Sequence, residues 1–194
     1  AAMIYRLFTF LARMTLTVVR RWDVQGREKL PASGGIVLVA NHISYWDPVA
    51  IICAFNRKVH FMAKAELFNI PVLSTILKIG GSFPVRRDIS DRSAIRTAVK
   101  LLEAGEVVGV FPEGTRSHTG ELLKPNLGAA MLAARVGVPM IPVAVIGTRG
   151  VIGRIKVRVG NPIDICKPGK CSKSDLEKAS DLIMEQINFL IGQQ

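Results

Sequence analysis

The apolar run I-V-L-V at residues 36–39 is the sequence feature that most restricts the fold of this chain. Four consecutive aliphatic residues with no polar member are typical of a strand that is covered on both faces. Similar runs occur at residues 107–111 and 138–147, and segments with helical apolar spacing lie between the runs. Strands that alternate with helices predict an α/β domain with a mixed, largely parallel sheet flanked by helices.

Polar residues follow the first run directly. Asn41 and His42 stand at its carboxyl end, and Asp47 follows a few residues later. Open α/β sheets bind ligands at this end of their strands, and a pair of histidine and carboxylate there can transfer protons. A purely structural alternative uses the same residues. Asp47 would then be the N-cap and Pro48 the first residue of the next helix, and His42 would be a hydrogen-bonded histidine at a strand end.

Composition restricts the partners. The 194 residues are 49% hydrophobic, which suits one domain with a sizeable core. The net charge of +11 favours anionic partners, such as an anionic membrane surface or phosphorylated small molecules. Nucleic acid is not expected, because only 6% of the residues are aromatic and no basic and aromatic recognition pattern is present.

The chain has three cysteines, Cys53, Cys166 and Cys171. An odd number at these spacings gives no disulfide framework, and no Cys/His pairs with the spacing of a zinc site accompany them. We therefore expect three reduced thiols in a cytosolic setting, and no bound metal.

Residues 1–21 predict a helix that is distinct from the domain formed by residues 22–194. The arginines and threonines of this segment recur at steps of three and four, so they share one stripe of a helix, and most other residues are apolar. The arginines interrupt the segment too often for a membrane-spanning helix. We expect an amphipathic, monotopic helix whose apolar side enters the membrane interface and whose arginines meet lipid phosphates. The alternative is a helix that docks on its own domain.

Four sequence blocks then follow in a fixed order. They are N-H-x4-D at residues 41–47, G-S-F-P-V-R-R at 81–87, F-P-E-G-T-R-S at 111–117 and V-P-M-I-P-V-A at 138–144. Each block alone is weak evidence. Together they resemble the glycerolipid acyltransferase family, specifically the 1-acylglycerol-3-phosphate acyltransferases, over residues 22–165.

The resemblance implies a reaction and its catalytic residues. An acyl thioester, either acyl-CoA or acyl carrier protein, would donate its acyl group to the sn-2 hydroxyl of lysophosphatidic acid, giving phosphatidic acid. His42 would accept the hydroxyl proton, and Asp47 would orient the imidazole and stabilise its protonated form. An ordinary imidazole pKa of about 6.5 suits this task at neutral pH. No metal and no resident cofactor are expected.

The resemblance also implies a set of acceptor-binding residues. Arg87 and Arg116 end two of the blocks, and a guanidinium matches the geometry of a phosphate. The family ties Glu113 and Gly114 to acceptor binding, although Glu113 could instead hold an arginine in place. The full predicted set is Lys64, Arg87, Glu113, Gly114, Thr115 and Arg116.

Two other functions fit the same residues. The acceptor could be another lysophospholipid or a lyso-aminolipid, or the chain could be a non-catalytic protein that binds anionic lipids. A covalent acyl-enzyme is not expected, because no G-x-S-x-G elbow is present, although Ser44 lies close to His42 in the sequence. The predicted location is the cytoplasmic face of the membrane, as a peripheral or monotopic protein.

Overall fold

The computed structural model describes residues 2–86, 91–166 and 169–193. Within these ranges, seven strands form one sheet in the order β1-β7-β6-β2-β5-β3-β4, and every neighbouring pair is parallel except β6 and β7. The predicted mixed, largely parallel sheet is therefore confirmed. The strands are β1 (Asp23–Gln25), β2 (Ile36–Ala40), β3 (Val59–Lys64), β4 (Phe83–Val85), β5 (Val107–Val110), β6 (Met140–Ile146) and β7 (Lys156–Val159).

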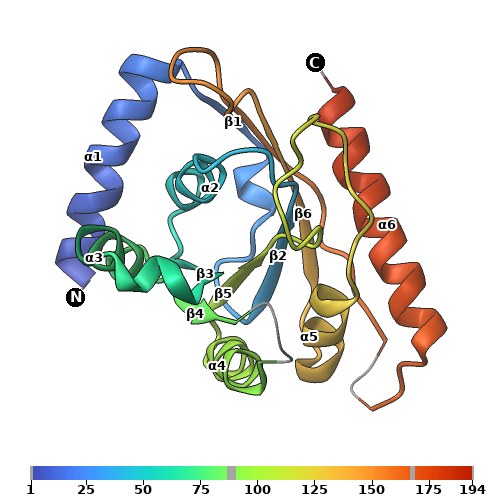
Figure 1. Ribbon diagram of the computed structural model, residues 1–194. Coiled ribbons are helices and arrows are strands. Elements are labelled where there is room, and N and C mark those ends of the chain that lie inside the picture. The colour runs from blue at the N-terminus through green and yellow to red at the C-terminus, as the bar shows by residue number, and fades with distance from the viewer. Residues whose placement is uncertain (1, 87–90, 167–168, 194) are drawn as a thin grey trace.

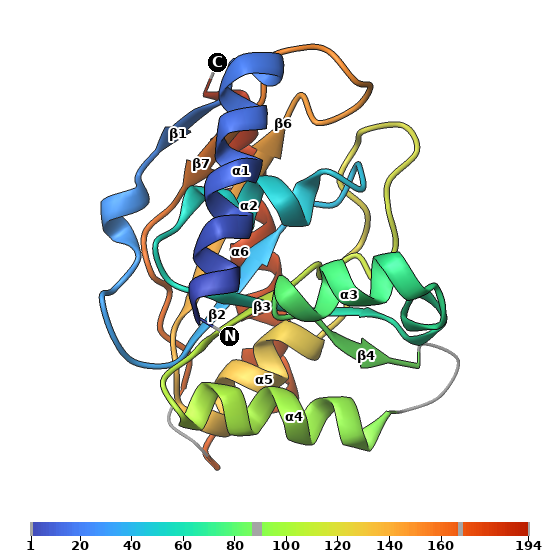
Figure 2. The same ribbon diagram turned by 90° about the vertical axis from the view of Figure 1, so that its left-hand side faces the viewer.

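Helices cover both faces of the sheet (Figures 1 and 2). α1 and α2 pack on one face, and α4, α5 and α6 pack on the other. Strand β2 lies between these layers with every residue buried, because its side chains alternate between them: Leu38 belongs to one core and Val39 to the other. The helices are α1 (Ala2–Arg20), α2 (Asp47–Ala54), α3 (Pro71–Ile79), α4 (Arg92–Glu103), α5 (Gly128–Val136) and α6 (Lys173–Gly192), with short 3₁₀ turns η1 (Arg27–Lys29) and η2 (Ala65–Asn69).

Helix α1 docks on the domain through the polar stripe that we expected to meet lipid. The guanidinium of Arg13 donates to the carbonyl oxygens of Cys53 and Phe55 at 2.8 and 2.7 Å, at the end of α2, where helix carbonyls lack partners. Arg20 is 1% exposed and donates to carbonyls of the loop after β6. For Arg13 and Arg20 the prediction of lipid contact is therefore wrong, because both side chains satisfy backbone carbonyls of the protein.

The opposite side of α1 is apolar and points away from the domain. Its members are at least 44% exposed: Met3, Ile4, Leu7, Phe10, Leu11, Met14, Val18 and Val19. Only the occasional residue of the helix, such as Leu16 at 0% exposure, enters the core. In the described part of the chain, no helix combines the length and the apolarity that crossing a membrane requires.

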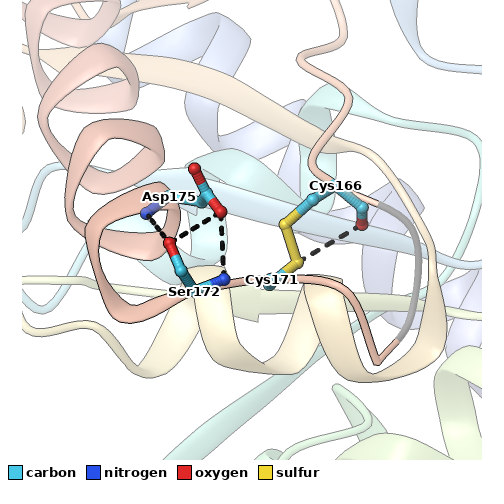
Figure 3. The surroundings of a disulfide bond; sticks show 4 residues. All are labelled: Cys166, Cys171, Ser172 and Asp175. Atoms are coloured by element: carbon cyan, nitrogen blue, oxygen red, sulfur yellow. Dashed lines mark hydrogen bonds between the residues drawn. A yellow bond between two sulfur atoms is a disulfide. The ribbon is translucent and has the colours of Figure 1, made fainter.

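Cys166 and Cys171 form a disulfide bond just before α6 (Figure 3), so the prediction of three reduced thiols is wrong for this pair. The chain brings their Cα atoms to 5.4 Å, within the range that a disulfide needs. Two cysteines this close in sequence can pair without any other disulfide bond, so the odd number of cysteines did not exclude this one. Cys53 is a free, buried thiol, and burial raises its pKa to about 11.

Reducing the disulfide is expected to lower the free energy of unfolding by about 2 kcal/mol, because the bridge closes only a short loop. Urea unfolding with and without reductant measures the difference. A Cys166→Ser/Cys171→Ser variant should unfold at the midpoint of the reduced protein and ignore the reductant. Identical midpoints for the oxidised and reduced wild type would contradict a stabilising bridge.

Candidate active site

The carboxyl ends of β2, β5 and β6 lie side by side, because β2 is the middle strand of the three. The chain leaves them as the segments 41–47, 111–117 and 147–148. These segments contain two of the four sequence blocks and the residues directly after strand β6, in which most of a third block lies. Sheet topology therefore brings together polar groups that are more than 100 residues apart in sequence.

His42 and Asp47 form a buried pair. The imidazole Nδ1 lies 2.8 Å from Oδ2 of Asp47, which is 0% exposed, whereas His42 keeps 9% exposure. The same carboxylate oxygen accepts the backbone N–H groups of Ile43 and Ser44 at 2.6 and 2.7 Å. Asp47 is the first residue of α2, and no side-chain bond caps this helix. The structural alternative, with Asp47 as a helix cap, is therefore wrong.

Thr148 completes the hydrogen bonding of Asp47, and the sequence analysis missed it. Its hydroxyl is fully buried and donates to Oδ1 of Asp47, the oxygen that the imidazole does not use. The available signal was its position, since Thr148 is the first polar side chain after the buried strand β6. With both oxygens occupied, the carboxylate has a single orientation toward His42.

Glu113 and Asn41 hold the backbone around His42. One carboxylate oxygen of Glu113 accepts the backbone N–H of His42 at 2.9 Å, and the other accepts that of Leu123 at 3.0 Å. Among the described residues, both hydrogen bonds of this buried carboxylate come from backbone N–H groups, and neither comes from an arginine. The amide of Asn41 pairs in both directions with the backbone of Val145 and extends the β2–β6 ladder by one side chain.

Phe111 covers one face of the imidazole. Its ring centroid lies 4.0 Å from that of His42 at an interplanar angle of 15°, and Phe61 stacks behind it at 5.1 Å. The stack needs the space beside Gly109, since a Cβ there would collide with the Phe61 ring. The sequence blocks contain Phe111 and Gly109 lies just before it, but the blocks say nothing of their contact with the histidine.

Arg116 is held by Tyr45, another residue that the sequence analysis did not identify. The guanidinium carbon lies 3.6 Å from the centroid of the Tyr45 ring, and Nη2 donates to the tyrosine hydroxyl at 2.9 Å. Tyr45 is 70% exposed, so this pair lies at the rim of the site. An aromatic residue inside the N-H-x4-D block was the signal available. The stacking on the Tyr45 ring limits the orientations of the Arg116 guanidinium.

The other predicted residues have different surroundings. Gly114 and Thr115 follow Glu113 on the exposed side of the same turn, and Gly114 has a left-handed backbone. Lys64 ends β3, two strands from β2, and lies 3.2 Å from Glu66 with half of its side chain exposed. Arg87 lies outside the described residues. The two histidines not predicted for the site have other surroundings: the His60 ring bonds to the carbonyl oxygen of Gly81, and the His118 side chain is exposed.

A cavity of about 510 Å³ lies next to the His42–Asp47 pair, on the side of strand β5. Met62, Val85 and Val110 give it apolar walls, and Phe111 and Glu113, which both contact His42, line it as well. Gly114, Thr115 and Asn126 supply its polar rim. In the described part of the chain, no three His, Cys, Asp or Glu side chains are grouped so that they could hold a metal ion.

The bond to Asp47 fixes what His42 can do. A carboxylate accepts the Nδ1–H, so the lone pair of the imidazole lies at Nε2, where it can take a proton from a hydroxyl group. This is the chemistry of a general-base enzyme of the α/β class.

Comparisons with known proteins specify the class further. Residues 21–146 match the family model described as Acyltransferase. The chain is 34% identical over 146 residues to a 1-acyl-sn-glycerol-3-phosphate acyltransferase of Bacillus subtilis, which covers 72% of each chain. It is 31% identical over 189 residues to the enzyme of that name from Streptococcus pneumoniae, covering 90% of this chain and 70% of the relative. The chain belongs to the acyltransferase family, which confirms the resemblance seen in the four blocks.

A solved structure agrees with this assignment. The crystal structure of the 1-acyl-sn-glycerophosphate (LPA) acyltransferase PlsC from Thermotoga maritima superposes with a TM-score of 0.77 at 26% identity. The match covers 98% of this chain and 80% of that one. The similarity therefore includes α1 as well as the sheet.

Proposed function

We propose that the protein is a 1-acylglycerol-3-phosphate O-acyltransferase, which transfers a fatty acyl group from a thioester to the sn-2 hydroxyl of lysophosphatidic acid and forms phosphatidic acid. The observation that carries the proposal is the buried His42–Asp47 pair, with Nε2 of the imidazole left as the proton acceptor. The relatives named for this activity and the related solved structure support the choice of substrate.

The reaction needs one base and no covalent intermediate. Nε2 of His42 takes the proton of the acceptor hydroxyl while the oxygen attacks the thioester carbonyl, and Asp47 stabilises the imidazolium that forms. The tetrahedral oxyanion then collapses, the C–S bond breaks, and the leaving thiolate takes the proton from His42. The free thiol and the new ester are the products, and the imidazole is ready for another turn. No metal and no resident cofactor take part.

Each contact of the pair has a role in this scheme. The hydroxyl of Thr148 and the backbone amides of Ile43 and Ser44 fix the Asp47 carboxylate in the position from which it accepts the Nδ1–H of His42. Glu113 fixes the backbone that carries the base. Because these groups are already bonded before substrate arrives, little reorganisation is needed during the reaction.

We assign the acceptor phosphate to the rim around Arg116. In the part of the chain that the structure describes, the stacked guanidinium donates one side-chain hydrogen bond, to Tyr45, which leaves it further N–H groups, and its planar fork suits a phosphate. Arg87 and Lys64 are further candidates, and Gly114 and Thr115 complete the turn that the phosphate would approach. The acyl donor is acyl-CoA or acyl carrier protein, and the apolar walls of the 510 Å³ cavity suit an acyl chain.

The proposal is tested by measuring thiol release from a long-chain acyl-CoA with and without lysophosphatidic acid, in detergent. Acceptor-dependent release, with phosphatidic acid as the product, is the expected result. Release with another lysophospholipid or a lyso-aminolipid, and not with lysophosphatidic acid, would replace the acceptor. No transfer from acyl-CoA or from acyl carrier protein, together with retained binding to anionic lipid, would favour the non-catalytic function.

Replacing Arg116 with alanine is expected to raise the KM for lysophosphatidic acid by ~10-fold or more, because charge-assisted hydrogen bonds contribute about 1.5–3 kcal/mol. Steady-state kinetics at saturating donor measure the change. Arg135→Ala is the matched control, since Arg135 is an exposed arginine on α5. An unchanged KM in Arg116→Ala would remove this residue from the phosphate site.

We also propose that the protein binds the cytoplasmic face of the membrane as a peripheral or monotopic protein, with the outward apolar side of α1 in the interface. Removing residues 1–21 would be a poor test, because the truncation would also remove the hydrogen bonds that Arg13 and Arg20 donate to backbone carbonyl groups of the domain. Point substitutions on the outward side avoid this problem.

Phe10→Glu is expected to lower the partition coefficient onto anionic liposomes by ~10-fold or more, because burying a phenylalanine contributes about 1.5–3 kcal/mol. Phe189→Glu on α6 is a matched control, since the two rings are 59% and 60% exposed on opposite sides of the sheet. Sedimentation with liposomes measures both. Equal losses in the two variants would argue against α1 as the membrane contact.

A further inference from the structure

The loop between β6 and β7 exposes two adjacent aliphatic side chains at its tip. Val151 is 73% exposed and Ile152 is 83% exposed, and the loop reads G-T-R-G-V-I-G-R from residue 147 to residue 154. We call these eight residues the β6–β7 loop. Single exposed aliphatic residues are ordinary on protein surfaces, but neighbouring ones at the tip of a loop carry a solvation cost that needs an explanation.

Hydrogen bonds from Arg20 hold the β6–β7 loop in one conformation, so the exposed position of its tip is a fixed feature of the fold. The buried guanidinium of Arg20 donates to the carbonyl oxygens of Gly147, Gly150 and Gly153 at 2.7, 2.8 and 3.2 Å. Gly147 has a left-handed backbone, and a Cβ there would collide with the carbonyl oxygen of Arg154. The conformation that presents the tip is therefore fixed by an arginine of α1 and by a glycine.

The tip continues the outward apolar side of α1. Ile152 lines one hollow together with Val18 and Val19 from the last turn of α1, and both residues are exposed. Figures 1 and 2 show the loop, in orange, beside this end of the helix. The apolar surface thus runs along α1 and turns onto the edge of the sheet that carries the candidate active site.

The charge around the tip selects the partner. Arg21 and Arg154 line the same hollow and are exposed, and neither α1 nor the β6–β7 loop contains an acidic residue. Aliphatic side chains with arginines beside them suit a bilayer whose headgroups are anionic: the chains enter the headgroup boundary and the guanidinium groups meet phosphates.

We propose that the β6–β7 loop is a second membrane contact, in which Val151 and Ile152 insert into the interface of an anionic bilayer and Arg21 and Arg154 bind lipid phosphates. The inference rests on the proposed function, since the membrane is where the lysolipid acceptor resides. It also goes further, because a single helix lying flat leaves the protein free to rotate about the helix axis, whereas a second contact fixes the orientation. Thr148 in the same loop bonds to Asp47, so this orientation places the catalytic edge at the membrane surface.

The test compares Val151→Ser/Ile152→Ser with wild type on vesicles of phosphatidylcholine and phosphatidylglycerol. We expect the partition coefficient to fall ~10-fold, because two aliphatic side chains leave the bilayer. Acylation of a vesicle-bound acceptor should fall with it, whereas acylation of a short-chain acceptor in solution should stay at the wild-type rate. Leu182→Ser/Phe189→Ser on α6 is the matched control, with two exposed apolar residues on the other side of the sheet.

Each contrary outcome has a distinct meaning. Wild-type partitioning of the tip variant, with a loss in Phe10→Glu, would leave α1 as the membrane contact and overturn the proposal. A wild-type dimer that becomes a monomer in the tip variant would overturn it in favour of contact between two copies. Activity on the soluble acceptor without any vesicle binding by the wild type would also overturn it, while leaving the proposed reaction intact.

Discussion

The His42→Ala variant is expected to lose ~10²–10⁴-fold in kcat and still fold, because general-base catalysis typically contributes this much. The fold should survive since the Asp47 carboxylate, left without the imidazole, still accepts the backbone N–H groups of Ile43 and Ser44 and the hydroxyl of Thr148. The buried charge therefore keeps three of its four donors. The KM for the acceptor should change little, because we assign the acceptor phosphate to Arg116 and not to His42.

Thiol release under saturating substrates measures the effect, and circular dichroism with urea unfolding confirms the fold. His118→Ala serves as the matched control, because the His118 side chain is exposed and, among the described residues, is not a hydrogen-bond partner of His42 or Asp47. A folded His42→Ala protein that retains more than a tenth of wild-type turnover would remove His42 as the base.

Asp47→Asn is expected to lower kcat by ~10²-fold or more without unfolding the protein, because the imidazolium loses its charged partner. The geometry accommodates the amide. Its oxygen can keep the three donors at the Oδ2 position, and its NH₂ group can donate to the hydroxyl oxygen of Thr148. Unfolding by urea should therefore resemble that of the wild type, while the rate falls.

Asp47→Ala provides the contrast. It leaves the Nδ1–H of His42 and two backbone N–H groups without an acceptor in a buried place, and each unpaired group costs about 1–3 kcal/mol. The alanine variant should be less stable as well as inactive. If the asparagine variant keeps wild-type turnover, the charge of Asp47 has no part in the chemistry.

The sequence predicted the sheet because its central strands β2, β5 and β6 are apolar runs, and their burial can be predicted without knowledge of the rest of the chain. His42 and Asp47 could also be predicted as a pair, because they lie in the same sequence block and in the same turn of the chain. Thr148 could not be found in this way. It reaches Asp47 from a strand 101 residues further along, through the adjacency of β2 and β6, and a lone threonine after a strand has many possible partners.

Helix α1 shows a different limit. The spacing of its arginines and threonines predicts that they share one stripe of the helix, but periodicity does not say which side faces the protein. Arg13 and Arg20 face it because carbonyl groups at the end of α2 and in the β6–β7 loop lack other donors. Every residue has a backbone carbonyl group, so the residue pattern does not reveal which of these groups needs a donor.

The stacking of Phe111 on His42 has a consequence for stereochemistry. The ring plane of an isolated imidazole is a mirror plane. The two enantiomers of a glycerol derivative would therefore have equal interaction energies with it. In this protein the phenyl ring of Phe111, whose centroid lies 4.0 Å from that of His42, covers one side of that plane, so the two sides are no longer equivalent. With His42 as the proposed base, we expect this asymmetry to contribute to the discrimination between the two enantiomers of an acceptor.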